Sequence, residues 1–312
     1  MIVFYADGSF KRGFGHLFRV KRIYENYFKN MDVRFLHLNE IQKNFYKKNN
    51  LNFISEDELS RTENKFNLFV VDSKKKEIKE LKSFLKRSSK SIAIDSTENW
   101  VSQFDYLIFP SFYFDKDLIN EKKSQVEIFY GRNFSIIPNS FAKNKEFKKI
   151  LITFGGSDPN DLSSLVLDKL KSLSLLNQAR LIVGPGFKKT KSFFEDKYEQ
   201  LEVVGPVNET ISYIYNSYII FTALGTTIQE IEYLGKIGLI LFNYDNDIHD
   251  FDMIRSNSNN NNNWYNLGSI TNPNLSEITK VVSNFKLIEK SDCQQNQNWG
   301  SGWKEILNDL ST

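Results

Sequence analysis

The sequence has a single cysteine, Cys293, among 312 residues, so it can hold neither an internal disulfide nor a metal site built from several cysteines. Its three histidines, His16, His37 and His249, lie in unrelated segments and lack the spacing of a zinc site. No apolar run approaches the roughly 20 residues that cross a bilayer. The first residues also lack the pattern of a secretory signal. These absences predict a cytoplasmic protein without a membrane span.

The sequence also lacks a large excess of charge of either sign, because 41 basic and 38 acidic residues leave a net charge of only +3. The lysines form scattered patches, such as Lys74 to Lys76, rather than a basic stripe, so no nucleic-acid partner is expected. Hydrophobic residues make up 40% of the chain and aromatic residues 14%, which is typical of a globular protein. A chain of this length suffices for two domains.

The N-terminal stretch carries the first informative pattern. An apolar run, Ile2 to Tyr5, predicts a buried strand, and glycines at 8, 13 and 15 then interrupt it. Apolar residues at 17, 20 and 23 have the spacing of a helix. His16 is therefore predicted to lie at the start of a helix.

A histidine in this position has a plausible chemistry. A helix N-terminus presents unpaired N–H groups and partial positive charge, which favour an anion such as a diphosphate. Gly13 and Gly15 would let a ligand approach the backbone closely, and His16 could act as a general base near neutral pH. From this segment alone, a histidine that only caps or packs is an equally good interpretation.

The same stretch, DGSFKRGFGHLFRVKRI, resembles the N-terminal signature of a known enzyme family. This family comprises the hydrolases that cleave UDP from UDP-2,4-diacetamido-2,4,6-trideoxy-altropyranose in pseudaminic acid synthesis, together with related spore-coat polysaccharide proteins. The shared elements are Asp7-Gly8-Ser9, then Gly13, Gly15-His16 and Arg19. The sequence differs from the family's pattern at Tyr5, Lys74, Phe134, Pro138 and Asp247. These differences leave open which sugar is bound and which reaction is catalysed.

The first half of the chain alternates strand and helix patterns, which predicts a parallel sheet with helices on both faces. Ligands of such sheets bind beyond the carboxyl ends of the strands, where Asp7, Asp72 and Asp95 fall. Helix capping is the favoured interpretation of Asp95, whereas capping and chemistry are equally favoured for Asp72. The expected strands are Val33 to Leu38, Leu68 to Val71, Ser91 to Ile94 and Asp105 to Phe109, with a helix over Glu77 to Lys86.

A second unit begins at Lys149 and repeats the design of the N-terminus. A strand, Ile150 to Phe154, leads into a turn and then into a helix from about Asp161. The turn consists of Gly155, Gly156, Ser157 and Asp158, and the resemblance implies that it lies near the uridine and ribose of a UDP-sugar. The segment 139 to 149 is the expected interdomain linker. With the resemblance, this repeat implies an α/β protein with two Rossmann-like domains, 1–142 and 143–312, that face a cleft as in the B-type glycosyltransferase fold. The last helix is expected to pack back on the first domain.

The third motif, FTALGTTIQEIEYL, opens with a strand at Tyr218 to Phe221. The resemblance implies that Gly225, Thr226 and Thr227 hold the diphosphate and that Glu230 holds the ribose. Hydroxyls and amides at a helix start suit phosphate oxygens, and a carboxylate suits two vicinal hydroxyls. The alternative is that the threonines only cap the helix and Glu230 is only a first-turn acid.

After a strand at Gly238 to Phe242, the segment NYDNDIHDFDMI carries Asn246, which corresponds to an asparagine that reaches into the cleft in the resembled family. Its aspartates have spacings that can hold Mg²⁺. A solvated acidic loop is the commoner case, so no metal site is expected. The run from Ser256 to Asn263 is a low-complexity turn or loop, and helices are expected at Ser276 to Phe285 and Gly302 to Leu310.

Two glycine-containing segments do not match the known cofactor-binding motifs that they partly resemble. The segment at Gly13 to Gly15 lacks the third glycine of a dinucleotide fingerprint. The segment GPGFKKT, Gly184 to Thr190, lacks the Walker spacing and is expected to be a surface loop.

Together, these patterns and the resemblance imply a monomeric enzyme that hydrolyses a UDP-sugar without a cofactor. His16 would activate a water that attacks the anomeric carbon from the face opposite UDP, with inversion. A UDP-sugar-dependent glycosyltransferase, in which an acceptor replaces water, and a non-catalytic nucleotide-sugar-binding protein are the alternatives.

Overall fold

The computed structural model describes residues 1–8, 14–62, 65–111, 126–138, 140–143, 145–245, 247–257, 263–283 and 299–309. Gly13, Asn246 and Cys293 lie outside the described residues. The chain divides into two compact units, Met1–Ile137 with Asn298–Thr312, and Pro138–Gln297. Within the described residues, no helix is long and apolar enough to cross a membrane.

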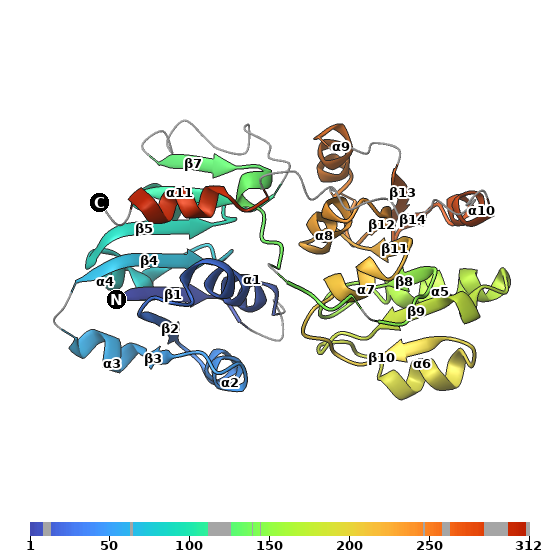
Figure 1. Cartoon of the computed structure of the whole chain (residues 1–312), viewed down its shortest axis with the longest axis horizontal. Helices are drawn as coiled ribbons and strands as arrows, with labels where there is room; N and C mark the ends of the chain where they lie inside the picture. The colour runs from blue at the N-terminus through green and yellow to red at the C-terminus, as the bar shows by residue number, and fades with distance from the viewer. Residues whose placement is uncertain are drawn as a thin grey trace. The chain divides into compact units, whose positions relative to one another are not determined.

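The first unit is built on a parallel sheet (Figure 1). Its strands lie in the spatial order β3 (Phe53–Ser55), β2 (Val33–His37), β1 (Ile2–Ala6), β4 (Phe66–Asp72), β5 (Ser88–Ile94), β6 (Tyr106–Phe109) and β7 (Glu127–Tyr130). All six neighbouring pairs are parallel. The runs of apolar residues in β1 and β4 are typical of strands that are buried on both faces.

Helices cover both faces of this sheet. They are α1 (Gly15–Ile23), α2 (Glu40–Lys48), α3 (Glu56–Arg61), α4 (Lys82–Leu85) and α11 (Gly302–Asp309). Alternate residues of β1 enter two separate cores: Phe4 packs in the cluster that contains α1, and Val3 packs in the cluster that contains α3 and α4. This alternation follows from the two-residue period of a strand.

Local sequence signals fix the starts of two of these helices. Asn39 and Gln42 form a reciprocal capping box at the start of α2, and Ser55 and Glu58 form another at the start of α3. Each box satisfies two backbone N–H groups that the helix geometry leaves unpaired.

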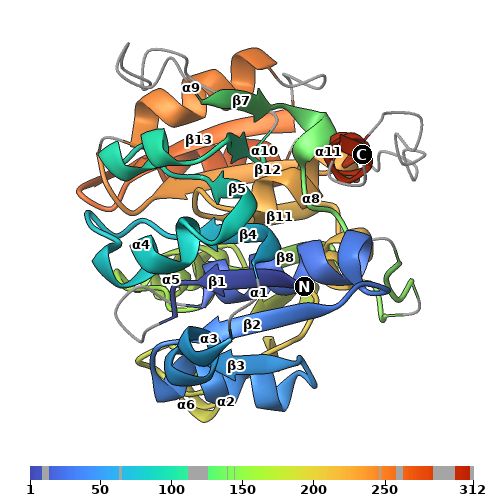
Figure 2. The same ribbon diagram turned by 90° about the vertical axis from the view of Figure 1, so that its left-hand side faces the viewer.

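The last helix, α11, belongs to the first unit although the second unit precedes it in the chain. Its Trp303 is 1% exposed, packs in the same cluster as α1, and donates from Nε1 to the carbonyl of Phe134 at 2.9 Å. Figures 1 and 2 both show α11 in red beside the green segment that follows β7. Phe134, where the resembled family has tyrosine, is therefore a core residue beneath α11.

The second unit repeats the architecture with the spatial order β10 (Glu202–Val204), β9 (Ala179–Ile182), β8 (Ile150–Ile152), β11 (Ile219–Thr222), β12 (Ile237–Phe242), β13 (Trp264–Ser269) and β14 (Asn272–Pro273). Only the last pair, β13 with β14, is antiparallel among these strands. The helices are α5 (Leu162–Ser172), α6 (Lys191–Lys197), α7 (Ile211–Tyr215), α8 (Thr227–Tyr233), α9 (Asp247–Asn257) and α10 (Ser276–Ser283). Ile219 and Phe221 of β11 pack in one core with α5, α6 and α10.

The predicted fold class is confirmed, since both units are Rossmann-like α/β sheets. Several details differ from the prediction. The strands β3, β7, β13 and β14 were not predicted. The expected helix over 77 to 86 is reduced to a 3₁₀ turn, Lys79–Leu81, and the short α4. The acidic segment predicted as a loop is largely the helix α9, which includes Ser256 of the run predicted as a turn or loop.

Candidate functional site

In each sheet there is one point at which successive strands change from one side of the first strand to the other. In the first unit, β1, β2 and β3 extend to one side, and β4 then starts on the other side of β1. Loops that leave such a switch point separate and open a crevice at the carboxyl ends of the strands. Asp7 and Gly8 follow β1, and Asp72 ends β4, so polar residues occupy this point.

Helix α1 places His16 at this point. The helix begins at Gly15, as predicted, and Phe14 gives its first turn no side-chain hydrogen bond. Gly8 allows α1 to lie close to the strand, since a Cβ at this position would lie 2.5 Å from Cδ1 of Leu17. Gly15 is exposed, with open space where a Cβ would point.

His16 and Asp72 form a close pair. Nδ1 of His16 lies 2.5 Å from Oδ1 of Asp72, and the side chain of Asp72 is fully buried, whereas that of His16 is 14% exposed. An ionised carboxylate only accepts, so Nδ1 carries the hydrogen, and in the neutral ring the lone pair is at Nε2. Within the part of the chain that the structure describes, Nε2 has no hydrogen-bond partner.

Arg19 holds Asp72 in place. Its Nε and Nη2 donate to the two oxygens of Asp72, each at 2.6 Å, and its Nη1 donates to Asp95 at 2.6 Å. Arg19 lies three residues after His16, so both side chains project from the same face of α1. Nη2 also lies 3.2 Å from Nδ1 of His16, but both atoms carry hydrogen, so this contact is not a hydrogen bond.

These contacts determine the charges. Burial alone would raise the pKa of Asp72, but the charges of Arg19 and His16 and their hydrogen bonds hold that pKa well below its usual range. For Asp95, burial is likewise outweighed by Arg19 and Lys74, and its pKa is also lowered. Burial would lower the pKa of Arg19, but Asp72 and Asp95 raise it above its ordinary value. Both carboxylates and the guanidinium are therefore ionised at neutral pH.

Asp95 does not cap a helix, so the favoured interpretation of this residue is wrong. The residue has a left-handed backbone, φ 50°, which aspartate tolerates, and it directs its carboxylate at Arg19. Lys74, where the resembled family has tyrosine, lies with Nζ 3.4 Å from the same oxygen of Asp95. Neither the Asp72–Arg19–Asp95 bridge nor the role of Lys74 in it was predicted. The three-residue spacing of His16 and Arg19 was the available signal.

Asp7 lies in a second polar group at the same end of the sheet. Its carboxylate accepts from the hydroxyls of Tyr5 at 3.0 Å and Ser73 at 2.7 Å, and Nζ of Lys75 is 3.7 Å away. Lys75 also donates to Tyr5 at 2.9 Å and to Glu80 at 2.7 Å. Asp7 is 2% exposed, so the structure gives it mainly internal partners.

The second unit has its switch point between β8 and β11, and both predicted glycine motifs follow these strands. Gly155 and Gly156 are exposed, and Gly155 has φ 74°. Among the described residues, no acceptor is found for the backbone N–H groups of Gly155, Gly156 and Ser157. Successive free N–H groups in a glycine turn can bind an anion.

The loop predicted as a surface segment holds this turn in place. Gly186 donates from its backbone to the carbonyl of Gly156 at 2.7 Å. A Cβ at Gly184 would lie 2.4 Å from the carbonyl oxygen of Gly155 and 2.6 Å from that of Gly156. Only glycine at 184 allows the two loops to pack this closely.

Asp158 is largely engaged with its own unit. It is 6% exposed, and its carboxylate accepts from the backbone of Leu162 at 2.8 Å and of Ser163 at 3.0 Å, in the first turn of α5. Burial raises the pKa of Asp158, and these hydrogen bonds oppose that effect.

The motif after β11 is more exposed to solvent at its start than at its end. Gly225 and Thr226 are exposed, Thr227 is half-buried, and the side chain of Thr226 makes no capping hydrogen bond to α8. Glu230 is only 3% exposed. The capping interpretation therefore does not account for Thr226.

The segment after β12 is anchored on the same unit. Asn160, after β8, donates to the backbone and side-chain oxygens of Asn243 at 3.1 and 3.2 Å, and Thr271 donates to Asp245 at 2.8 Å. Asp247 accepts from the backbone of Tyr244 at 3.3 Å. Within the described ranges, no group of three or more histidine, cysteine, aspartate or glutamate side chains is arranged to hold a metal ion.

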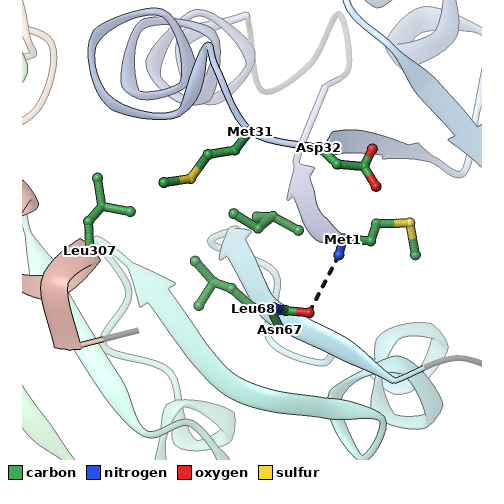
Figure 3. Close-up of a pocket in the computed structure, with 7 residues that line it drawn as sticks. Met1, Met31, Asp32, Asn67, Leu68 and Leu307 are labelled. Atoms are coloured by element: carbon green, nitrogen blue, oxygen red, sulfur yellow. Dashed lines mark hydrogen bonds between the residues drawn. The ribbon is translucent and has the colours of Figure 1, made fainter. Parts of the chain in front are cut away.

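A hollow of about 340 Å³ lies at the opposite, amino end of β1 and β4 (Figure 3). It is lined by Met1, Ile2, Met31, Asp32, Asn67, Leu68 and Leu307. Most of these side chains are apolar, and His16 and its partners lie at the other end of the strands. The hollow is therefore not the candidate site.

The strand orders and the polar loops at both switch points define a protein with two Rossmann-like domains, the B-type glycosyltransferase fold. The chain is similar to UGT89C1 of Arabidopsis thaliana, solved with UDP (TM-score 0.64, 10% identity, 100% of this chain and 99% of that chain). It is also similar to MnaA of S. aureus, solved with UDP (TM-score 0.60, 10% identity, 99% and 95%). A third is the UDP-GlcNAc 2-epimerase of Methanocaldococcus jannaschii (TM-score 0.58, 12% identity, 99% and 98%).

Comparisons of sequence alone are less informative. No model of a known protein family matches the chain. An uncharacterized protein of Methanocaldococcus jannaschii is 28% identical over an alignment 150 residues long, which covers 42% of this chain and 29% of that protein. The chain thus spans less than a third of the length of this relative.

Proposed function

We propose that this protein binds a UDP-sugar and hydrolyses it, releasing UDP. The observation that carries the proposal is His16, whose Nδ1 is held by buried Asp72 while Nε2 has no described partner. This arrangement leaves the lone pair of the neutral ring at Nε2, the requirement for a general base. The resemblance of the N-terminal motif supports a UDP-linked, acetamido-substituted deoxy sugar of surface-glycan synthesis as the substrate.

In the proposed reaction, Nε2 of His16 removes a proton from water while the water oxygen attacks the anomeric carbon. The bond between that carbon and the diphosphate oxygen breaks, and UDP leaves with the electron pair. Attack from the face opposite UDP inverts the configuration of the sugar. The imidazolium that forms is stabilised by the negative charge of Asp72. UDP is a competent leaving group, so the protein mainly supplies positioning and electrostatic stabilisation.

The second unit would bind the nucleotide. The N–H groups of Gly155 to Ser157 and the hydroxyls of Thr226 and Thr227 suit diphosphate oxygens. Glu230 would accept from the ribose hydroxyls, and Gly225 would allow close approach. The UDP complexes of two similar structures support a nucleotide on this fold. Gly13, Gly15, Asp7, Asp158 and Asn246 complete the proposed substrate contacts.

A glycosyltransferase is the second candidate. The same His16–Asp72 pair would deprotonate the hydroxyl of an acceptor as readily as water. UGT89C1, which was also solved with UDP-L-rhamnose, has the same fold, which keeps this alternative open.

A panel of UDP-sugars, incubated with the purified protein in H₂¹⁸O, tests the proposal. Free UDP and a sugar with ¹⁸O at the anomeric carbon, in the inverted configuration, are expected without any acceptor. UDP release that needs an added acceptor would assign the protein to the transferases, and a changed sugar still linked to UDP would indicate an epimerase. Binding of UDP without turnover of any sugar would refute the hydrolase.

A further inference from the structure

Two side chains outside the His16–Asp72 pair are connected to it through Arg19. Nη1 of Arg19 donates to Oδ2 of Asp95 at 2.6 Å, and Nζ of Lys74 lies 3.4 Å from that same oxygen. A continuous series of contacts therefore runs from the imidazole through a carboxylate, a guanidinium and a second carboxylate to an ammonium group.

Exposure increases steadily from Asp72 outward to Lys74. The side chain of Asp72 is fully buried and that of Arg19 is 9% exposed, whereas Asp95 is 30% and Lys74 is 61% exposed. The inner groups are fixed by packing. The outer groups contribute charge, and a change in Lys74 leaves the buried packing intact.

Arg19 is shared between two carboxylates. Its guanidinium donates two hydrogen bonds to Asp72 and one to Asp95, so its positive charge partly neutralises both carboxylates. The effective negative charge of Asp72 near His16 therefore depends on the charge of Asp95. The carboxylate of Asp95 competes with Asp72 for the positive charge of Arg19, and the positive charge of Lys74 weakens this competition.

We propose that Asp95 and Lys74 are positioning residues that adjust, through Arg19, how strongly Asp72 attracts the protonated ring of His16. For its catalytic meaning this inference rests on the proposed function. The coupling of charges is a property of the first unit alone. It assigns a role to Lys74, one of the positions at which the sequence departs from the family that it resembles.

Other ionisable groups at this end of the sheet belong to a separate set. Tyr5, Asp7, Lys75 and Glu80 contact one another, as described above. Tyr46 of α2 is fully buried, and burial raises its pKa far above the neutral range, so it stays uncharged. None of these groups contacts Arg19 or Asp95 in the described part of the chain.

The two outer residues have opposite expected effects. Asp95→Asn removes a negative charge and lets Arg19 neutralise Asp72 more fully, so the imidazolium of His16 is destabilised. Lys74→Met removes a positive charge from beside Asp95. Asp95 then competes more strongly for the charge of Arg19, Asp72 is less fully neutralised, and the imidazolium of His16 is stabilised. We expect the titration midpoint of His16 to fall by roughly half a pH unit or more in the first variant and to rise by a similar amount in the second.

The test is an NMR titration of the protein labelled with ¹⁵N in its histidine rings. The chain has only three histidines, so the His16→Gln variant assigns the signal. The ring nitrogens also report the tautomer, and the hydrogen is expected on Nδ1. Lys43→Met is the matched control, because burial and then the charge of Lys43 lower the pKa of His37, which lies outside the series. This variant should raise the midpoint of His37 and leave that of His16 unchanged.

A fall in the titration midpoint of His16 in Asp95→Asn, together with a rise in Lys74→Met, supports the proposal. Equal shifts, shifts of the same sign, or no shift in Lys74→Met overturn it. If Asp95→Asn fails to fold, Lys74→Met alone decides, because an exposed lysine can be replaced without disturbing the core. The readout needs no substrate, so a protein that turns over no UDP-sugar can still pass or fail this test.

Discussion

His16 and Asp72 are 56 positions apart in the sequence, and their side chains meet at 2.5 Å. Helix α1 supplies one and the end of β4 supplies the other, so the pair exists only when the β1–β4 pairing is in register. Because β4 is a central strand of the sheet, the pair rests on a rigid part of the first unit.

Replacing the proposed base tests the chemistry directly. His16→Gln should lower kcat by about 10²- to 10⁴-fold, the usual contribution of a general base. The affinity for UDP should stay within a few fold, since the nucleotide is assigned to the second unit. Measurements of UDP release and calorimetric binding check both. His37→Gln, on β2, is the control and should keep normal turnover; equal turnover in His16→Gln would remove the base assignment.

Asp72→Asn should lower the stability of the first unit in a pH-dependent way. At pH 7 the change leaves Arg19 with one charged partner fewer in a buried position, a loss of about 3 kcal/mol in the free energy of unfolding. The pKa of Asp72 in the folded protein lies below its ordinary value of 3.8. Its contribution is therefore present above that ordinary value and is lost as the pH falls toward the folded pKa.

Urea unfolding of both proteins at several pH values measures this effect. The difference between wild type and Asp72→Asn should be largest near neutral pH and should shrink below about pH 4. A difference that stays constant down to pH 2 would contradict the depressed pKa.

Gly184→Ala should disturb the glycine turn after β8. The added Cβ would meet two backbone carbonyl oxygens of Gly155 and Gly156, which cannot move independently of the turn. We expect a loss of thermal stability and a lower affinity for UDP, as measured by calorimetry. Gly205→Ala is the matched control, because a Cβ there meets nothing within 4 Å, and it should change neither quantity. Wild-type affinity in Gly184→Ala would separate this turn from the nucleotide site.

Thr226→Val tests whether the hydroxyl binds phosphate. The side chain makes no capping bond, so stability should be unchanged, whereas loss of one hydrogen bond to the diphosphate should weaken UDP binding by roughly tenfold. Thr190→Val provides the reverse case, since Thr190 caps α6 by accepting from Phe193 at 3.2 Å. It should cost about 1 kcal/mol of stability and leave UDP affinity unchanged. Equal UDP affinity in wild type and Thr226→Val would exclude this contact.

Trp303→Ala should destabilise the first unit by about 3–5 kcal/mol, because it empties a fully buried indole site. Trp303→Phe retains a ring but loses the hydrogen bond to Phe134, so its cost should be smaller. Hydrogen exchange should show faster opening of β1 and α1 in the alanine variant and unchanged protection of β11. Equal effects on both units would argue against the assignment of α11 to the first.

The central strands were predictable because they are continuous apolar runs between turn residues, as in β1, β4 and β12. The edge strands β7 and β14 were not. β7 has half-exposed and exposed residues only, and β14 is two residues long, so neither carries a periodic signal. Helix α9 was predicted as a loop because its aspartates and asparagines favour loops. Two of the aspartates, Asp247 and Asp250, lie in its first turn, where negative charge is favourable.

The position of His16 was predictable from local rules, since glycines followed by helical apolar spacing place it at a helix start. Its partners were not. Asp72 and Asp95 are 53 and 76 residues from Arg19, and only the pairing of β1, β4 and β5 brings their carboxylates to one guanidinium. Both aspartates were predicted at strand ends, but capping was an equally good interpretation of Asp72 and the favoured one of Asp95 until the contacts were known.

The return of the chain to its first unit has a consequence for biosynthesis. Because Trp303 completes the core around α1, the N-terminal unit reaches its final packing only after α11 has emerged from the ribosome. The intervening unit is contiguous and can fold earlier. A nascent chain that stalls before residue 302 should therefore hold a folded second unit beside a first unit that is still open to proteases.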